Sequence, residues 1–308
     1  MAASAPSVFA DRLILRTRAL GHPLCVGLDP HPDRLPACFS RGPLRARDPL
    51  TADVVENFLC TVIDRLVGRV AAVKPQIAFF EQLGWRGLRA LERVVAHARS
   101  ADLSVVLDAK RGDIGSTAAA YGAAYLTPGA ALPIDALTVH PYLGIDSLAP
   151  LVATAQAHGR GLFVLVKTSN PGAGALQDLR LDGRCLYQHV AASLRPAVDA
   201  LEAPETGWSS LGVVVGATYP RDAEQVRSCL PRALFLVPGF GAQGAGASDA
   251  VRGFVRGPGG RREGGLVNSA RAILFPPGSE SADRRRYSQL LDDAVERAAD
   301  VLAAAVSA

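Results

Sequence analysis

Two carboxylates and an ammonium group stand close together in this sequence, as Asp108, Lys110 and Asp113. They follow an apolar, β-branched run at residues 103–107, which indicates a buried strand. Side chains repeat every second residue along a strand, so Asp108 and Lys110 are expected on one side. Charges grouped at the end of an apolar strand are costly unless they pair. The cluster therefore predicts either an ordinary ion pair at a strand end or a catalytic charge array.

Other predicted strands also end in side chains that can do chemistry. Lys74 directly follows the apolar run 70–73, and is expected to enter a site or to extend to its rim. Asp29 follows the run 24–27 and precedes a proline, so a turn residue and a site residue are both open interpretations. Ser169 lies in a polar segment after the run 161–166 and could read the edge of a flat polar ring. Lys167 and His140 also end strands, and either a structural or a site role is open for each.

A glycine-rich segment at residues 238–246 follows the seventh predicted strand. Glycines at this density allow backbone N–H groups to approach an anion closely. Gln243 within the segment can add a neutral donor, and Arg271 after the eighth strand offers a fork suited to phosphate. These residues predict a phosphate site, with a flexible glycine loop that binds no phosphate as the alternative.

Short apolar strands alternate with helical patterns along the whole chain, which positions these residues. The expected strands cover residues 24–27, 70–73, 103–107, 136–139, 161–166, 211–215, 234–237 and 265–267. The clearest helical patterns cover residues 52–66, 88–98, 186–201, 223–230 and 287–305. About eight strand-then-helix units predict an α/β fold, a (β/α)₈ TIM barrel, whose active site lies at the carboxyl ends of the strands. A doubly wound open sheet is the rival, but no GxGxxG follows the first strand.

Composition and length bound the remaining possibilities. Residues 1–308 are expected to form a single barrel domain with an amino-terminal helix at residues 8–20 and loop insertions at 37–49 and 253–265. No membrane span, signal peptide or nucleic-acid platform is apparent, and the net charge of +4 is compatible with an anionic small substrate. The five cysteines form no CxxC pair and no metal spacing with the six histidines, so we expect a reduced, cytoplasmic protein without a metal.

Taken together, these segments resemble the orotidine 5′-phosphate decarboxylase family, and most closely its longer bacterial, type 2 subgroup. The resemblance rests on VKPQ around Lys74, DAKRGDIGSTA from Asp108, TSNPGA from Thr168, and the two phosphate loops, in this order. It covers nearly all of the chain, about residues 23–275. Related phosphosugar decarboxylases share the DxKxxD element, but the complete series is highly specific. The insertions 37–49 and 253–265 do not fit the compact family core, so no role is assigned to them.

The resemblance implies a barrel that works as a homodimer with shared active sites and needs no cofactor. By position, Lys110 would donate a proton to C6 of the pyrimidine, and Asp108 would sit beside the leaving carboxylate. Lys74 would hold Asp108 and the ribose. The remaining roles would be shared among Asp29 on a ribose hydroxyl, Ser169 on the pyrimidine, Gln243 and Arg271 on the phosphate, and Asp113 with Thr117 in the neighbouring subunit's site.

Two rival functions stay open on the sequence. One is a Mg²⁺-dependent phosphosugar decarboxylase or aldolase of similar architecture, although no extra carboxylate for a metal accompanies Lys74. The other is a non-catalytic nucleotide-binding barrel, which would not need a clustered array of two lysines and two aspartates. The implied substrate is orotidine 5′-phosphate, the implied product is UMP, and no nucleic acid or membrane partner is expected.

Overall fold

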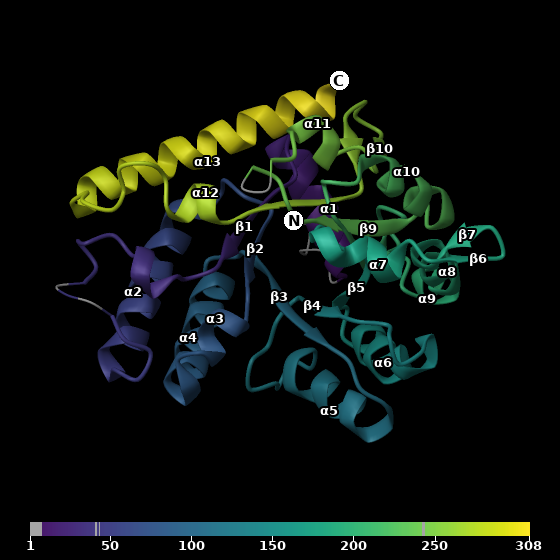
Figure 1. Ribbon diagram of the computed structural model, residues 1–308, viewed down its shortest axis with the longest axis horizontal. Helices are drawn as coiled ribbons and strands as arrows, with labels where there is room; N and C mark the ends of the chain where they lie inside the picture. Colours follow the sequence, from purple (N-terminus) through teal and green to yellow (C-terminus); the bar gives the residue numbers. More distant parts are fainter. Residues whose placement is uncertain (1–7, 41, 43, 242–243) are drawn as a thin grey trace, which may run out of the picture.

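Eight parallel strands close into a barrel in the computed structural model, which describes residues 8–40, 42, 44–241 and 244–308 (Figure 1). Around the barrel the order is β1-β2-β3-β4-β5-β8-β9-β12, so strands that follow one another along the barrel chain are neighbours in space. The barrel strands are β1 Leu24–Leu28, β2 Ala72–Pro75, β3 Ser104–Arg111, β4 Ala136–Val139, β5 Gly161–Lys167, β8 Ser209–Val215, β9 Ala233–Val237 and β12 Gly265–Ser269. This confirms the predicted (β/α)₈ barrel and all eight predicted strands.

Helices follow the strands and cover the outside of the barrel. They are α1 Phe9–Leu20, α2 Pro49–Leu66, α3 Ala78–Glu81, α4 Gly84–Ser100, α5 Gly115–Tyr125, α6 Ala149–Ala157, α7 Gly174–Gln177, α8 Leu186–Ser193, α9 Arg195–Ala200, α10 Pro220–Cys229, α11 Ala247–Ala250, α12 Arg271–Leu274 and α13 Arg284–Ser307. In Figure 1 the long yellow helix α13 runs along one side of the molecule. Over the described ranges, no helix is both long enough and apolar enough to cross a bilayer.

Two sequence predictions about local structure need correction. The helical pattern 186–201 is two helices, α8 and α9, because Pro196 in the first turn of α9 has no N–H to continue the hydrogen-bond ladder. The insertion 253–265 is not only loop, since β10 Val255–Arg256 pairs with β11 Arg262–Glu263 as an antiparallel hairpin. Helices α5 and α6 gave little sequence signal because they are rich in alanine, which leaves no distinct apolar stripe.

Helix α1 closes the amino-terminal end of the barrel. Its residues Phe9, Ala10, Leu13 and Ile14 are fully buried and form one apolar cluster with side chains from inside the barrel. The ring of Phe9 meets the ring of Phe163 from β5 edge to face, with centroids 6.1 Å apart. The predicted amino-terminal helix is therefore part of the barrel's core.

Side chains alternate between the inside and the outside of the barrel along each strand. The inward positions are apolar near the strand starts and polar near the carboxyl ends. Inward residues near the strand starts, such as Ala72 and Val106, belong to the apolar cluster with α1. Two residues further on, the same strands present Lys74 and Asp108 to the upper cavity. The outward residues between them pack against the helices as the larger core cluster. A switch from apolar to polar at inward positions thus builds a floor and a site in one barrel.

Candidate active site

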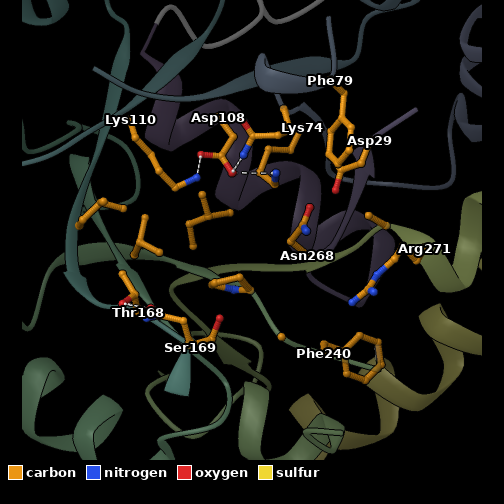
Figure 2. Close-up of a pocket in the computed structure, with 18 residues that line it drawn as sticks. Asp29, Lys74, Phe79, Asp108, Lys110, Thr168, Ser169, Phe240, Asn268 and Arg271 are labelled. Carbon is orange, nitrogen blue, oxygen red and sulfur yellow. Dashed lines mark hydrogen bonds and ion pairs between the residues drawn. The ribbon is translucent and has the colours of Figure 1, made fainter. Parts of the chain in front are cut away.

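A cavity of about 500 Å³ opens at the carboxyl ends of the barrel strands. Figure 2 shows Lys110, Asp108 and Lys74 together on one side, with Arg271 and Phe240 at the other end. The lining includes most of the residues that the sequence predicted for a site: Asp29, Lys74, Asp108, Lys110, Ser169 and Arg271. The remaining lining residues are Gln76, Phe79, Leu165, Thr168, Asn170, Val214, Leu236, Pro238, Gly239, Phe240, Asn268 and Ala270.

The carboxylate of Asp108 is the centre of the polar network. Its Oδ2 accepts hydrogen bonds from Nζ of Lys74 at 3.1 Å and from Nε2 of Gln76 at 3.0 Å. Its Oδ1 accepts from Nζ of Lys110 at 2.6 Å and from Oγ1 of Thr138 at 2.9 Å. A carboxylate has about four acceptor positions. These four donors therefore fix both the charge and the orientation of Asp108.

Lys110 reaches this network from an unusual backbone conformation. Its φ is 48°, in the left-handed region that residues other than glycine rarely adopt. The pairing of β3 with β4 changes register between Leu107 and Arg111, which brackets this position. The Oγ1 of Thr138 accepts from the backbone N–H groups of Ala109 and Lys110, both at 2.9 Å, and so supports the irregular turn.

Burial and charge act in opposite directions on the ionisable groups of the cavity floor. Desolvation alone would lower the pKa of Lys74, but the carboxylates of Asp108 and Asp29 raise it above its ordinary value. Desolvation alone would raise the pKa of Asp108, but Lys74 and Lys110 lower it well below its usual range. Lys74 is therefore a fixed cation and Asp108 a fixed anion at neutral pH.

Two oxygen atoms in the cavity are buried and have no hydrogen-bond partner among the described residues. They are Oδ1 of Asp29 and Oδ1 of Asn268. Burial raises the pKa of Asp29, and the nearby cation of Lys74 only partly offsets this. Unsatisfied buried polar atoms are uncommon and require an explanation. Because Asp29 and Asn268 line the cavity, their side chains are suited to accept hydrogen bonds from hydroxyl or N–H groups of a ligand.

The opposite end of the cavity carries the groups expected for an anion. Arg271 begins the short helix α12 and lines the cavity beside Phe240. In the loop after β9, Gly239 and Gly241 have φ of 100° and 76°, which favour glycine. Gln243, which was predicted to bind phosphate, lies outside the described residues.

The end of β5 divides its polar residues between the cavity and the barrel exterior. Thr168 and Ser169 line the cavity. Lys167 does not, and its side chain is fully buried and paired with Asp178. Its Nζ lies 4.6 Å from the centre of the ring of Tyr219, and β5 changes register between Leu165 and Lys167. Lys167 therefore anchors the loop that carries Ser169 without entering the cavity.

Three further residues stand outside the cavity of this chain. The Oδ1 of Asp113 accepts a hydrogen bond from the N–H of Ile114 at 2.8 Å, and Thr117 is exposed on α5. Neither of these two predicted site residues lines the cavity. The ring of His140 packs over Gly112, where a Cβ atom would meet Nε2 at 2.4 Å. His140 thus has a packing role that requires glycine at position 112.

Gln76, Thr138 and Asn268 were not among the site residues predicted from the sequence. All three occupy polar positions where a barrel strand or its extension would otherwise continue the apolar inward pattern: Ala136 precedes Thr138 by two residues, and Leu266 precedes Asn268 by two. Counting inward positions in steps of two from the apolar floor would have found them.

The arrangement is suited to hold an anionic ligand and to stabilise new negative charge. Lys74, Lys110 and Arg271 contribute three cations, against the two acids Asp29 and Asp108. The Lys110 side chain is 46% exposed, so its amine can contact a molecule in the cavity. An ammonium fixed beside a reacting atom stabilises an anion more strongly in a site from which water is excluded.

Comparisons with known proteins show which family the chain is similar to. Residues 22–285 match the model of the orotidine 5′-phosphate decarboxylase / HUMPS family. The orotidine 5′-phosphate decarboxylase of Rhodopirellula baltica is 47% identical over 276 residues, covering 87% of this chain and 88% of that protein. The one from Deinococcus radiodurans is 40% identical over 293 residues, covering 95% and 98%. The structure of Leishmania donovani OMP decarboxylase is 32% identical, has a TM-score of 0.71, and matches over 95% of this chain and 99% of its own.

Proposed function

Because the chain belongs to the orotidine 5′-phosphate decarboxylase family, we propose that it converts orotidine 5′-phosphate to UMP and CO₂ in pyrimidine biosynthesis, without a cofactor. The enzyme class that this implies is a carboxy-lyase. The observation that supports the proposal most directly is the position of Lys110. Its amine belongs to the cavity that also contains Lys74 and Arg271, and it pairs with Asp108.

The proposed role of Lys110 follows from the chemistry of the substrate. Loss of CO₂ from C6 of the pyrimidine leaves an electron pair in an sp² orbital, with no adjacent carbonyl group to accept it. A fixed cation beside C6 stabilises this localised anion. The ammonium of Lys110 then transfers a proton to C6 as the general acid, and UMP is formed.

Asp108 is proposed to lie next to the carboxylate that leaves. Two negative charges about 4 Å apart repel by roughly 4 kcal/mol at an effective dielectric constant near 20. Four donors hold Asp108, so it cannot turn away easily from this repulsion. Enzymes lower barriers by about 8–23 kcal/mol, and so the larger share belongs to Lys110 and the preorganised charges.

The rest of the cavity is proposed to bind the nucleotide away from C6. Oδ1 of Asp29 accepts a hydrogen bond from a ribose hydroxyl, which would satisfy a buried oxygen that otherwise has no described partner. Ser169 contacts the pyrimidine, and Arg271 and Gln243 hold the phosphate. Binding energy from the phosphate can close the glycine loop and order the charges around C6.

We further propose a homodimer in which Asp113 and Thr117 complete the neighbouring subunit's site. In one chain neither residue lines the cavity, although Asp113 follows Lys110 by only three residues. Apolar side chains beside them support a contact at this end of the barrel: Ile114 is 62% exposed and Tyr142 is 78% exposed. An acid from the partner would place Lys110 between two carboxylates.

The proposal also includes a single-domain organisation and a cytoplasmic location. Residues 1–308 are taken to form a single domain, because the barrel strands extend from Leu24 to Ser269 and α13 packs back on them. A cytoplasmic location is supported by five cysteines that are all free thiols, as expected in a reducing compartment.

A Mg²⁺-dependent phosphosugar decarboxylase is the main rival within this architecture. A metal ion in this cavity would need carboxylate oxygens with free acceptor positions, but those of Asp108 are occupied by four protein donors. The deciding experiment measures CO₂ release from orotidine 5′-phosphate with excess chelator. Undiminished turnover supports the proposal. Turnover of a phosphosugar that stops with chelator would replace it, and binding of UMP without turnover would indicate a non-catalytic barrel.

A further inference from the structure

A second cavity, of about 410 Å³, lies at the amino-terminal end of the barrel. Part of its wall consists of residues that directly precede parallel strands: Leu103 before β3, Asp135 before β4 and Arg160 before β5. Such residues share the face opposite to the carboxyl ends of the strands, where the active site lies. Helix α1 supplies another wall with Arg12 and Arg16. We call this cavity the basal pocket.

Positive charge exceeds negative charge in the basal pocket. Four arginines from three segments line it, namely Arg12, Arg16, Arg99 and Arg160. Two acids, Asp102 and Asp135, are also in the lining, so four positive and two negative groups give a formal charge of +2. None of the residues outside the described ranges has an acidic side chain, so they cannot supply a missing carboxylate.

One carboxylate is shared among several donors in this pocket. Oδ1 of Asp135 accepts from Nη2 of Arg12 at 2.8 Å and from Nη1 of Arg160 at 2.9 Å. Its other oxygen, Oδ2, accepts from the N–H of Val105 at 2.9 Å. Asp135 thus has little remaining capacity for the other guanidinium groups, and Arg99 donates instead to the carbonyl of Pro133 at 3.3 Å.

Two of the arginines retain unused donors. Nε of Arg160 is buried without a partner in the part of the chain that the structure describes, and its side chain is only 11% exposed. Desolvation lowers the pKa of Arg160, and Arg99 and Arg12 add to this, against the opposing effect of Asp135. Arg16 makes no hydrogen bond or ion pair to any described residue. The guanidinium of Arg16, which lines the pocket without a described partner, is available to donate to an anion there.

We propose that the basal pocket binds a small phosphate-bearing anion with a charge near −2. Guanidinium groups match phosphate oxygens through paired hydrogen bonds, and the excess charge of the lining corresponds to a phosphate dianion. The apolar side chains of Leu15 and Leu103 in the same lining leave space for a small organic group, as in a phosphate monoester. The pocket is distinct from the proposed phosphate site at Arg271, since the two lie at opposite ends of the barrel.

Calorimetric titration with inorganic phosphate tests this proposal in an Arg271→Ala background, which removes the anion site of the active-site cavity. The variant is expected to bind one phosphate per chain. Adding Arg16→Ala should weaken that binding roughly ten-fold or more, because a charge-assisted contact is lost. Arg16→Lys should restore part of it. Arg285→Ala, an equal charge change at an exposed position in the first turn of α13, should leave it unchanged.

The effect of Arg16→Ala on binding can be separated from effects on folding and on catalysis. Arg16 has no partner among the described residues, so Arg16→Ala should keep the thermal midpoint of the parent. Phosphate should raise that midpoint less in Arg16→Ala than in the parent. The titration requires no turnover, so its outcome is independent of the proposed decarboxylase activity. The proposal is wrong if the Arg271→Ala variant binds no phosphate, or if Arg16→Ala and Arg285→Ala have equal effects.

Discussion

The Nζ atom of Lys110 lies 2.6 Å from Oδ1 of Asp108, and Lys110 makes this contact from a left-handed backbone conformation with a φ of 48°. A non-glycine residue in this region costs free energy that the surrounding structure must offset. Here Thr138 bonds both the backbone N–H of Lys110 and the carboxylate of Asp108. The relationship between the two charged residues is thus fixed by a third residue on the neighbouring strand.

Replacing Lys110 by alanine should abolish turnover while UMP still binds. The variant loses both the cation beside C6 and the proton donor, so kcat should fall by roughly three orders of magnitude or more. Affinity for UMP, measured by calorimetry, should remain substantial because the Arg271 end of the cavity is intact. A Lys110→Ala enzyme with near-normal kcat would remove Lys110 from its proposed role.

Gln76 should contribute to catalysis through Asp108. Gln76→Leu removes one of the four donors to the carboxylate and is expected to lower kcat roughly ten-fold, with a smaller effect on KM. The matched control is Gln82→Leu, because Gln82 is exposed and donates only to the carbonyl of Phe79. Equal kcat values for the two variants would show that Gln76 does not position Asp108.

Arg271 should act on the phosphate and not on the reacting ring. Arg271→Ala is expected to lower kcat/KM for orotidine 5′-phosphate by roughly a hundred-fold, as a charge-assisted pair is lost. Orotidine, which lacks the phosphate, supplies the control: its slow decarboxylation should proceed at the same kcat/KM in both proteins. Equal losses for the two substrates would instead mean that the substitution distorts the whole cavity.

Shared sites in a dimer predict complementation between inactive variants. Asp113→Ala and Lys74→Ala proteins should each be nearly inactive, and mixing them should restore up to about a quarter of wild-type sites if subunits pair at random. The restored activity should appear at the rate of subunit exchange, followed by fluorescence transfer between labelled chains. Full exchange without any recovery of activity would exclude shared sites.

Asp29 should destabilise the empty protein above mildly acidic pH. A carboxyl group whose pKa is raised on folding binds its proton more tightly in the folded state, so stability falls as pH rises from the unfolded value, about 4, through the folded one. Asp29→Asn should therefore raise the thermal midpoint at pH 7.5 by about 2 °C or more while weakening substrate binding. Scanning calorimetry should show that this gain shrinks toward pH 4.5, and a gain that grows there would contradict the assignment.

The barrel and the cluster of charged residues in its cavity could be predicted because both depend on local sequence patterns. Each strand is a short apolar run, Asp108 and Lys74 directly follow such runs, and Arg271 lies two residues beyond the end of β12. The same rule does not tell which way a residue points where the strand becomes irregular. Lys167 faces outward because β5 changes register beside it, which the sequence pattern does not reveal.

Details that depend on contacts between distant segments were beyond sequence reasoning. The pairing of Gln76 and Thr138 with Asp108 joins β3 to segments 32 and 30 residues away. The left-handed conformation of Lys110 is equally hidden, because lysine has no preference for it. The position of Asp113 outside its own chain's cavity was implied by the family resemblance and not by the residue pattern, which grouped Asp113 with Asp108 and Lys110.

The apolar packing of α1 against the inside of the barrel also affects how substrate and products can enter and leave the cavity. Phe9, Leu13 and Ile14 are fully buried in the apolar cluster that fills the floor of the barrel. The product nucleotide and CO₂ are then expected to leave through the opening at the carboxyl ends of the strands, by which the substrate enters. A segment that closes over this opening would control the release of both products. If that segment opens slowly, product release would be the rate-limiting step.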